Sequence, residues 1–258
     1  MKHLRFQFVL LLVLISVIQC RKSLDSAVKT RDTIFQISVL DALMAGIYDG
    51  SMSFGELKQN GDFGLGTFNA LDGEMVTLND TVYQVRADGS VQVIADNQKT
   101  PFAVITFFNP DTVIRVGTTL IREQIEACID KALISFNIPV AIKITGFFET
   151  VRTRSVPAQV RPYPRLTEVL KTQPEFRLEN VHGTIVGFRL PAYLKNINAP
   201  YYHFHFITDD KSAGGHLLRF NGHDLQIEID YKNHLEIQLP HDQDFRNVDF
   251  DKDADTDH

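Results

Sequence analysis

The apolar residues of this chain change their spacing at Phe63, and this change constrains the fold more than any other feature. Before it, apolar residues recur at helical spacing over 36–48, and Ser53 and Gly61 frame a second short helix as N-cap and stop signal. After it, the spacing becomes two, and turn dipeptides interrupt the chain. These dipeptides are Asp72-Gly73, Asn79-Asp80 and Asp88-Gly89. We expect a meander of antiparallel strands that includes EMVTL, TVYQVR and SVQVIA.

The middle of the chain predicts a buried strand, a helix and a further strand. The run PFAVITFF (101–108) is almost fully apolar, as is typical of a central strand. Residues 119–136 have helical periodicity, and residues 140–150 again favour a strand. Three prolines within 157–164 then indicate a linker.

The opening of the chain recurs in weakened form after the proline-rich stretch. The order of the matches is kept while the loops between them differ, which favours two related halves, although chance could produce any single match. The matches are Leu57-Lys58 and Asp62-Phe63 with Leu170-Lys171 and Glu175-Phe176, Gly66-Thr67-Phe68 with Gly183-Thr184-Ile185, and Pro101-Phe102 with Pro200-Tyr201.

The expected fold class is therefore α+β, with two related halves that each contain a mostly antiparallel or mixed β-sheet and short helices. The N-terminal half is expected over 33–152 and a β-rich, metal-binding C-terminal half over 165–248. Residues 249–258 form an acidic tail that we expect to be solvated.

The first 20 residues have the pattern of a signal peptide. Basic residues precede an apolar run over 8–18, which is shorter than the ~20 residues that span a bilayer. We therefore expect an exported, extracytoplasmic protein, either periplasmic or extracellular. Cys20 lies where signal peptidase would act, and it is either the lipid-bearing cysteine of a lipoprotein or an inert residue beside a simple cleavage site. Cleavage after it would leave Cys128 alone, so no intramolecular disulfide could form.

The charge of the chain argues against a nucleic-acid partner. The net charge is -6, and no run of lysine and arginine exceeds two residues. Phosphate backbones require a basic face, which this sequence does not predict.

Three histidines near the C-terminus have the spacing of a metal site. In YYHFHFI (201–207), His203 and His205 lie two apart, so a strand would place both on one face and the phenylalanines on the other. A polar turn then leads to His216, which a hairpin would bring across the sheet to the first two. Three imidazoles with an open coordination position are typical of catalytic zinc. The alternative is that three core or rim histidines happen to share one hairpin.

Four segments, taken in order, resemble the bacterial alpha-acetolactate decarboxylases over nearly all of the chain beyond the signal. They are GDFGLGTFNALDGEMV (61–76), GFFETVRTRSVPAQVRPY (146–163), HGTIVGFRLPAYL (182–194) and HFHFITDDKSAGGHLL (203–218). This resemblance implies a Zn²⁺ cofactor, 2-acetolactate as the small-molecule substrate, a site between two mixed α+β halves, and a homodimer.

The resemblance also implies the residues of the site. Three histidines are implied as zinc ligands, and a glutamate in LDGE, an arginine in RSVP and a pocket hydroxyl in GTF as catalytic residues. In this sequence these are His203, His205, His216, Glu74, Arg154 and Thr67. The chain departs from the family in having no glutamate after Glu236, so Asp249 or Asp251 is the candidate to replace a C-terminal glutamate that can reach the metal.

The chemistry implied is decarboxylation of 2-acetolactate to acetoin and CO₂, as in acetoin and butanediol biosynthesis. Loss of CO₂ leaves negative charge on the neighbouring carbonyl oxygen, which a Lewis-acid cation stabilises. Glu74 is the candidate proton donor, and Arg154 is expected to orient the substrate carboxylate. Two other functions stay open at this point: a zinc hydrolase of esters or lactones, and a non-enzymatic metal-binding lipoprotein.

Overall fold

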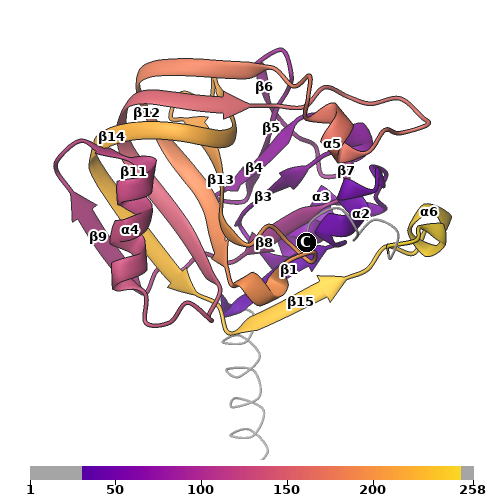
Figure 1. Ribbon diagram of the computed structural model, residues 1–258, viewed down its shortest axis with the longest axis horizontal. Coiled ribbons are helices and arrows are strands. Elements are labelled where there is room, and N and C mark those ends of the chain that lie inside the picture. The colour runs from indigo at the N-terminus through magenta and orange to yellow at the C-terminus, as the bar shows by residue number, and fades with distance from the viewer. Residues whose placement is uncertain (1–30, 251–258) are drawn as a thin grey trace, which may run out of the picture.

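The computed structural model describes residues 31–250, which form two packed β-sheets with short helices (Figure 1). The α+β class expected from the sequence is confirmed. The predicted signal peptide over 1–20, the lipid anchor at Cys20 and residues 251–258 of the acidic tail lie outside the described residues. Within residues 31–250, no helix has both the length and the apolar character needed to cross a bilayer.

The first sheet has seven strands in the order β15-β1-β8-β3-β4-β5-β6. The outermost strand β15 runs parallel to β1, and all other neighbours are antiparallel. This sheet contains the expected meander, and the apolar 101–108 run supplies its central strand β8. The strands are β1 (Thr33–Ile37), β3 (Phe63–Thr67), β4 (Glu74–Leu78), β5 (Thr81–Val85), β6 (Val91–Val93), β8 (Ala103–Thr106) and β15 (His234–Gln238). A separate pair joins β2 (Met52–Ser53) to β7 (Lys99–Thr100).

The second sheet is built on three long strands. β11 (Val140–Arg154) pairs antiparallel with β12 (Glu175–Leu190) on one edge and with β14 (Gly214–Tyr231) on the other. β13 (Tyr201–Thr208) pairs with both β12 and the start of β14, so these four strands close into a ring of pairings. The short strands β9 (Thr112–Val116) and β10 (Leu120–Ile121) add to β14.

The two sheets divide the chain differently from the expected halves 33–152 and 165–248. Strands β9, β10 and β11 belong to the second sheet, and β15 returns to the first. This division arises because the long strand β11 pairs along both of its edges with β12 and β14, which lie in the C-terminal part of the chain. The proline-rich segment is therefore not a linker between two domains: Val156 is buried between the sheets, and the Ser155 hydroxyl donates a hydrogen bond to the Val85 carbonyl at 2.7 Å.

The predicted repeat falls on matching elements of the two sheets. Each copy begins at a short helix, α3 (Phe54–Leu57) or α5 (Leu166–Val169), and leads into β3 or β12. The third match precedes β8 or β13, which is the antiparallel neighbour of that strand in its own sheet.

One predicted helix is wrong in its first part. Residues 33–37 form β1, and the helix is limited to α2 (Leu40–Met44). Ile34 packs between the sheets while Phe35 and Ile37 pack on the opposite face, so β1 is buried on both sides and shows no polar alternation that would reveal a strand.

The other predicted helices are confirmed. A capping box between Ser53 and Glu56 starts α3, as the N-cap signal indicated. The helix predicted within 119–136 is α4 (Arg122–Ala132), and a further short helix, α6 (Gln243–Asn247), precedes the tail. The 3₁₀ turns are η1 (Lys58–Asn60), η2 (Asn69–Leu71) and η3 (Ala192–Leu194).

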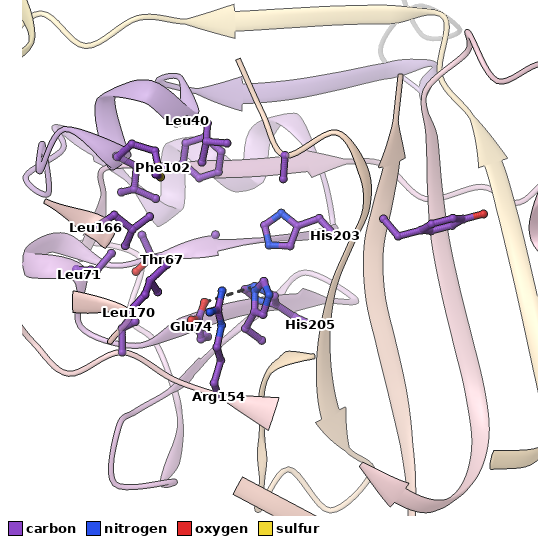
Figure 2. A pocket seen from close by; sticks show the side chains of 17 residues that line it. Leu40, Thr67, Leu71, Glu74, Phe102, Arg154, Leu166, Leu170, His203 and His205 are labelled. Atoms are coloured by element: carbon purple, nitrogen blue, oxygen red, sulfur yellow. Dashed lines mark ion pairs between the residues drawn. The ribbon is translucent and has the colours of Figure 1, made fainter. Parts of the chain in front are cut away.

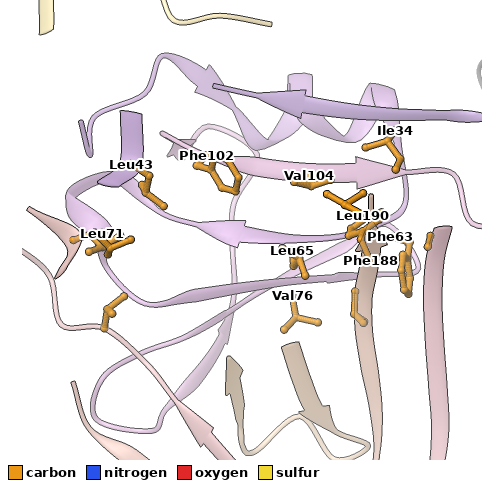
Figure 3. Packing of buried hydrophobic residues seen from close by; sticks show 14 of the residues in the cluster. Ile34, Leu43, Phe63, Leu65, Leu71, Val76, Phe102, Val104, Phe188 and Leu190 are labelled. Atoms are coloured by element: carbon orange, nitrogen blue, oxygen red, sulfur yellow. The ribbon is translucent and has the colours of Figure 1, made fainter. Parts of the chain in front are cut away.

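Three apolar clusters hold these layers together, and the largest fills the space between the sheets (Figure 3). In this cluster Leu65 and Val104 of the first sheet share a core with Phe188 of the second. A second cluster joins the second sheet to α4, and a third covers the outer face of the first sheet with α3. The functional site described below lies at the same junction between the sheets.

A buried lysine that follows β14, Lys232, contacts both the end of that strand and segments of the first sheet. The Lys232 side chain is 0% exposed, and its Nζ lies 2.7 Å from the Asp230 carboxylate. The same Nζ donates hydrogen bonds to the carbonyls of Arg31 at 2.6 Å and Phe107 at 3.0 Å. Lys232 therefore connects the end of β14 to the segments that precede β1 and follow β8.

We expect Lys232→Met to lower the free energy of unfolding by about 3–5 kcal/mol, because it leaves a buried carboxylate without its cation. Urea unfolding at neutral pH measures this loss. The matched control is Lys171→Met, which removes an exposed pair with Glu168 and is expected to cost less than about 1 kcal/mol. Equal losses in the two variants would contradict the prediction.

Candidate metal centre and active site

The hairpin of β13 and β14 brings three histidines together, as the sequence predicted. His203 and His205 lie on the same face of β13, and His205 stands directly opposite His216 on β14. The phenylalanines between and after the two β13 histidines point the other way, into the cluster against α4. Alternation along one strand and register across the hairpin therefore place all three imidazoles on one side.

The three rings are close enough to share one cation (Figure 2). Their candidate ligand nitrogens all lie within 4.8 Å of one another. The ring centroids are separated by 5.3 Å for His203 and His205, 5.1 Å for His203 and His216, and 5.3 Å for His205 and His216. Within the described residues, this is the group whose geometry fits a metal ion.

Each imidazole is held in its neutral form. Burial lowers the pKa of His203 to about 4, with the charge of Arg154 acting in the same direction. The pKa values of His205 and His216 are also lowered well below the usual range, again mainly by burial. Neutral imidazoles keep the nitrogen lone pairs that metal coordination needs.

Hydrogen bonding orients at least one of the three rings. His205 is 1% exposed, and its Nδ1 lies 2.7 Å from the Met75 carbonyl, which fits Nδ1–H as the donor. That tautomer leaves Nε2 as the lone-pair nitrogen facing the other histidines. His203 Nδ1 is buried without a hydrogen-bond partner within residues 31–250. A buried nitrogen of this kind is costly unless something binds it, so the residues present fit a zinc ion.

The hairpin of β3 and β4 supplies Thr67 and Glu74. These two residues are the cross-strand pair nearest the turn, and both line the same cavity as the histidines. The Thr67 hydroxyl donates to the Gly73 carbonyl at 2.7 Å, which stiffens the turn before Glu74. Glu74 Oε2 lies 3.4 Å from His205 Nε2. The sequence segments GTF and LDGE thus meet at the histidines.

Glu74 is a buried acid with an unusual affinity for its proton. It is 8% exposed, and burial raises its pKa to about 8, even though the charge of Arg154 acts to lower it. Burial therefore outweighs the arginine in the metal-free protein. A cation at the histidines would lower this pKa again.

Arg154 enters the site from the end of β11, where it pairs in register with His216. Burial lowers the pKa of its guanidinium, and its Nε is buried without a hydrogen-bond partner among the described residues. Figure 2 shows Arg154 and Glu74 directed toward His205. An arginine with an unused donor beside a cavity can bind an anionic group of a ligand.

These side chains line a cavity of about 330 Å³. Its other walls are largely apolar and come from α2, from α5 and from segments of both sheets. The apolar residues include Leu40, Leu43, Met44, Leu71, Phe102, Val156, Leu166 and Leu170. The sequence did not reveal them as site residues, because nothing in an apolar residue's local pattern separates a cavity wall from ordinary core.

Tyr202 is a further lining residue that sequence analysis missed. Its hydroxyl donates to the Asp130 carboxylate at 2.7 Å, and Arg189 binds the same oxygen at 3.0 Å. Asp249, in contrast, is exposed and does not line the cavity, while Asp251 lies outside the described residues. The described residues thus provide no aspartate in place of the C-terminal glutamate.

Comparison with known proteins shows the family of this chain. A family model described as alpha-acetolactate decarboxylase matches residues 34–252. An alpha-acetolactate decarboxylase from Klebsiella aerogenes is 43% identical over 220 residues, covering 85% of this chain and 85% of that protein. The chain belongs to the alpha-acetolactate decarboxylase family. The alpha-acetolactate decarboxylase from Methylococcus capsulatus is 42% identical over 207 residues, or 80% of each chain.

Solved structures of the family share the fold. The crystal structure of alpha-acetolactate decarboxylase from Bacillus subtilis has a TM-score of 0.83 and 39% identity, and the match covers 85% of this chain and 94% of that chain. A Staphylococcus aureus protein described as similar to alpha-acetolactate decarboxylase gives a TM-score of 0.82 at 29% identity, with 85% and 96% coverage. The family expected from the four sequence segments is confirmed, and the protein is an acetolactate decarboxylase, a carboxy-lyase.

Proposed function

We propose that this decarboxylase is zinc-dependent and converts 2-acetolactate to acetoin and CO₂ at the site of His203, His205 and His216. The observation that supports it best is three neutral imidazoles within 4.8 Å of one another, facing a cavity that a buried acid and a buried arginine also line. Three nitrogen ligands with an open position suit catalytic Zn²⁺.

The reaction needs positive charge where negative charge develops. When the bond to the carboxylate breaks, its electron pair moves onto the neighbouring carbon and the keto oxygen, which gives an enediolate. A zinc ion would supply Lewis-acid stabilisation of this charge without reorganisation of the site. The apolar walls of the cavity strengthen such electrostatic effects by excluding water.

Glu74 is the proposed proton donor to the enediolate carbon. Burial keeps its carboxyl ready to hold a proton near neutral pH, and its Oε2 lies beside His205. The Thr67 hydroxyl, opposite Glu74 and bonded to Gly73, is proposed to hold the turn that positions this acid. Delivery of the proton from one side of the cavity would produce a single acetoin enantiomer.

Arg154 is proposed to orient the substrate through its carboxylate. A tight grip on a group that departs as neutral CO₂ would favour the ground state over the transition state, so its main effect is on binding. We expect Arg154→Lys to raise KM by at least about tenfold with a smaller change in kcat, because lysine cannot form the two-pronged guanidinium contact. Steady-state kinetics with acetolactate measures this, and a fall in kcat at constant KM would contradict it.

Metal analysis of the purified protein together with an acetoin assay tests the proposal as a whole. We expect about one zinc per chain, loss of acetoin formation when a chelator removes the zinc, and recovery when zinc is returned. Full activity in metal-free protein would overturn zinc dependence.

We also propose, from the N-terminal sequence alone, that the protein is exported, with a lipid anchor at Cys20 as a further expectation. The resemblance to the family adds the expectation of a homodimer. Cell fractionation, mass spectrometry of the mature N-terminus and sedimentation of the purified protein test these three points separately. An unprocessed N-terminus on cytoplasmic protein would overturn the export proposal.

A further inference from the structure

A second hollow of about 520 Å³ lies on the second sheet, apart from the metal centre. None of its lining residues belongs to the cavity described above. Four of the nine lining residues are arginines, and Glu123 is the one carboxylate among them. The lining residues are Ile121, Arg122, Glu123, Thr150, Arg152, Arg177, Arg219, Phe220 and Asn221.

Three of the arginines form a row across neighbouring strands. Arg152 on β11 stands directly opposite Arg177 on β12, and on its other side it stands directly opposite Arg219 on β14. Like charges in directly opposed positions of a sheet repel one another and are unfavourable for folding. All three residues are exposed, so core packing does not account for them. Figure 1 shows β11, β12 and β14 running side by side in this region.

Carboxylates compensate this charge incompletely. Arg152 forms an ion pair with Glu175, and Arg177 forms one with Glu179 at 2.7 Å. Neither glutamate lines the hollow, and such exposed pairs contribute little. Each pair also uses only part of the five N–H donors of a guanidinium.

The other two arginines of the hollow differ in their surroundings. Arg122 is engaged, because its guanidinium binds Glu126 at 2.7 Å and the carbonyls of Leu217 and Leu218 at 3.0 and 2.9 Å. Arg219 has no ion pair within residues 31–250. The hollow therefore presents unused guanidinium donors from three strands, with Arg219 the most available.

The geometry points to this hollow as a binding site for a small phosphate-class anion. Planar guanidinium forks match the oxygens of a tetrahedral oxyanion, and neighbouring strands allow several arginines to contact one such group. The volume is that of a small-ligand site. The net charge of the chain is -6, which disfavours a nucleic-acid partner and argues for a small anion.

The test is calorimetric titration of the zinc-loaded protein with inorganic phosphate, with sodium chloride at matched ionic strength as the reference. We expect saturable phosphate binding that Arg219→Gln weakens about tenfold and the double variant Arg152→Gln/Arg219→Gln about a hundredfold. Arg115→Gln, on β9 of the same sheet but outside the hollow, is the matched control and should leave the affinity unchanged.

Thermal unfolding separates a binding role from a structural one. Without phosphate, Arg219→Gln should melt no lower than the unmodified protein because one repulsion is relieved. With phosphate, the unmodified protein should gain thermal stability that this variant lacks. The inference would be overturned if millimolar phosphate showed no saturable binding, or if Arg115→Gln weakened binding as much as Arg219→Gln does. It would also be overturned if Arg219→Gln left the affinity unchanged, which is the result expected if phosphate binds at the metal centre instead.

Discussion

His205→Ala is expected to remove both bound zinc and acetoin formation, with turnover falling by at least about a thousandfold. His205 is adjacent to both other candidate ligands, since His203 is its neighbour on the same face of β13 and His216 is its cross-strand partner. Its loss leaves two imidazoles, which cannot hold the ion at ordinary concentrations. Without the ion, the charge that develops on decarboxylation has no cation nearby, and electrostatic stabilisation of that kind is usually the largest catalytic contribution.

The same substitution should also weaken folding, since it leaves the Met75 carbonyl without its donor, at a cost of about 1–3 kcal/mol. Metal analysis, acetoin assay and circular dichroism on the same preparation therefore belong together. His182→Ala, which removes an exposed histidine from β12 of the same sheet, is the matched control and should keep both zinc and activity. A folded His205→Ala protein with zinc and full turnover would dispose of the site.

Glu74→Gln is expected to lower kcat by about a hundred- to ten-thousandfold while zinc stays bound, because the amide keeps the shape of the acid and cannot transfer its proton. Glu74 Oε2 lies 3.4 Å from His205 Nε2, and the side chain lines the cavity in which the substrate is proposed to bind. Stopped-flow assay of acetoin formation with parallel metal analysis measures the two effects. Thr77→Val, on the same strand but outside the cavity, is a suitable control. Unchanged kcat in Glu74→Gln would remove the proposed donor.

The pKa of Glu74 also predicts how the metal-free protein responds to pH. In the folded chain this pKa is about 8, against an ordinary value of 4.5, so between these values the folded state holds a proton that the unfolded state releases. Stability should therefore fall as pH rises through this interval, by up to about 1.4 kcal/mol per pH unit. Glu74→Gln should lack this slope. Urea unfolding of chelator-treated protein at several pH values checks it, and parallel curves for the two proteins would contradict it.

Much of the fold could be predicted from local pattern. The meander after Phe63, the buried strand within 101–108 and the helix N-cap at Ser53 depend on residues close in sequence, and each is present. The predictions of secondary structure and of the halves were wrong where residues distant in sequence determine burial and strand pairing. The helix predicted over 36–48 included the last two residues of β1, because the burial of both faces of this strand hides its alternation. The boundary between the halves was misplaced because β11 pairs with strands far along the chain.

The histidine site was predicted for a local reason, which is that a strand alternates every two residues and a short turn returns the chain beside it. His203, His205 and His216 all lie within one hairpin. Glu74, Thr67 and Arg154 could not be placed in this way, and only the resemblance of the segments 61–76 and 146–163 to a known family singled them out. The cavity walls and Tyr202 carried no signal in the sequence.

Residue spacing along one hairpin was enough to predict the three imidazoles and their common face, and the resemblance of four segments was enough to predict the family. Only the packing of the two sheets decided that Glu74 and Arg154 meet those imidazoles and that apolar side chains from α2 and α5 close the cavity around them. The same packing raises the pKa of Glu74 to about 8 when no cation is bound. The positions of side chains within one hairpin depend on strand alternation and on the turn, which are set by residues close in sequence. Burial and the electrostatics it controls depend on the packing of two whole sheets.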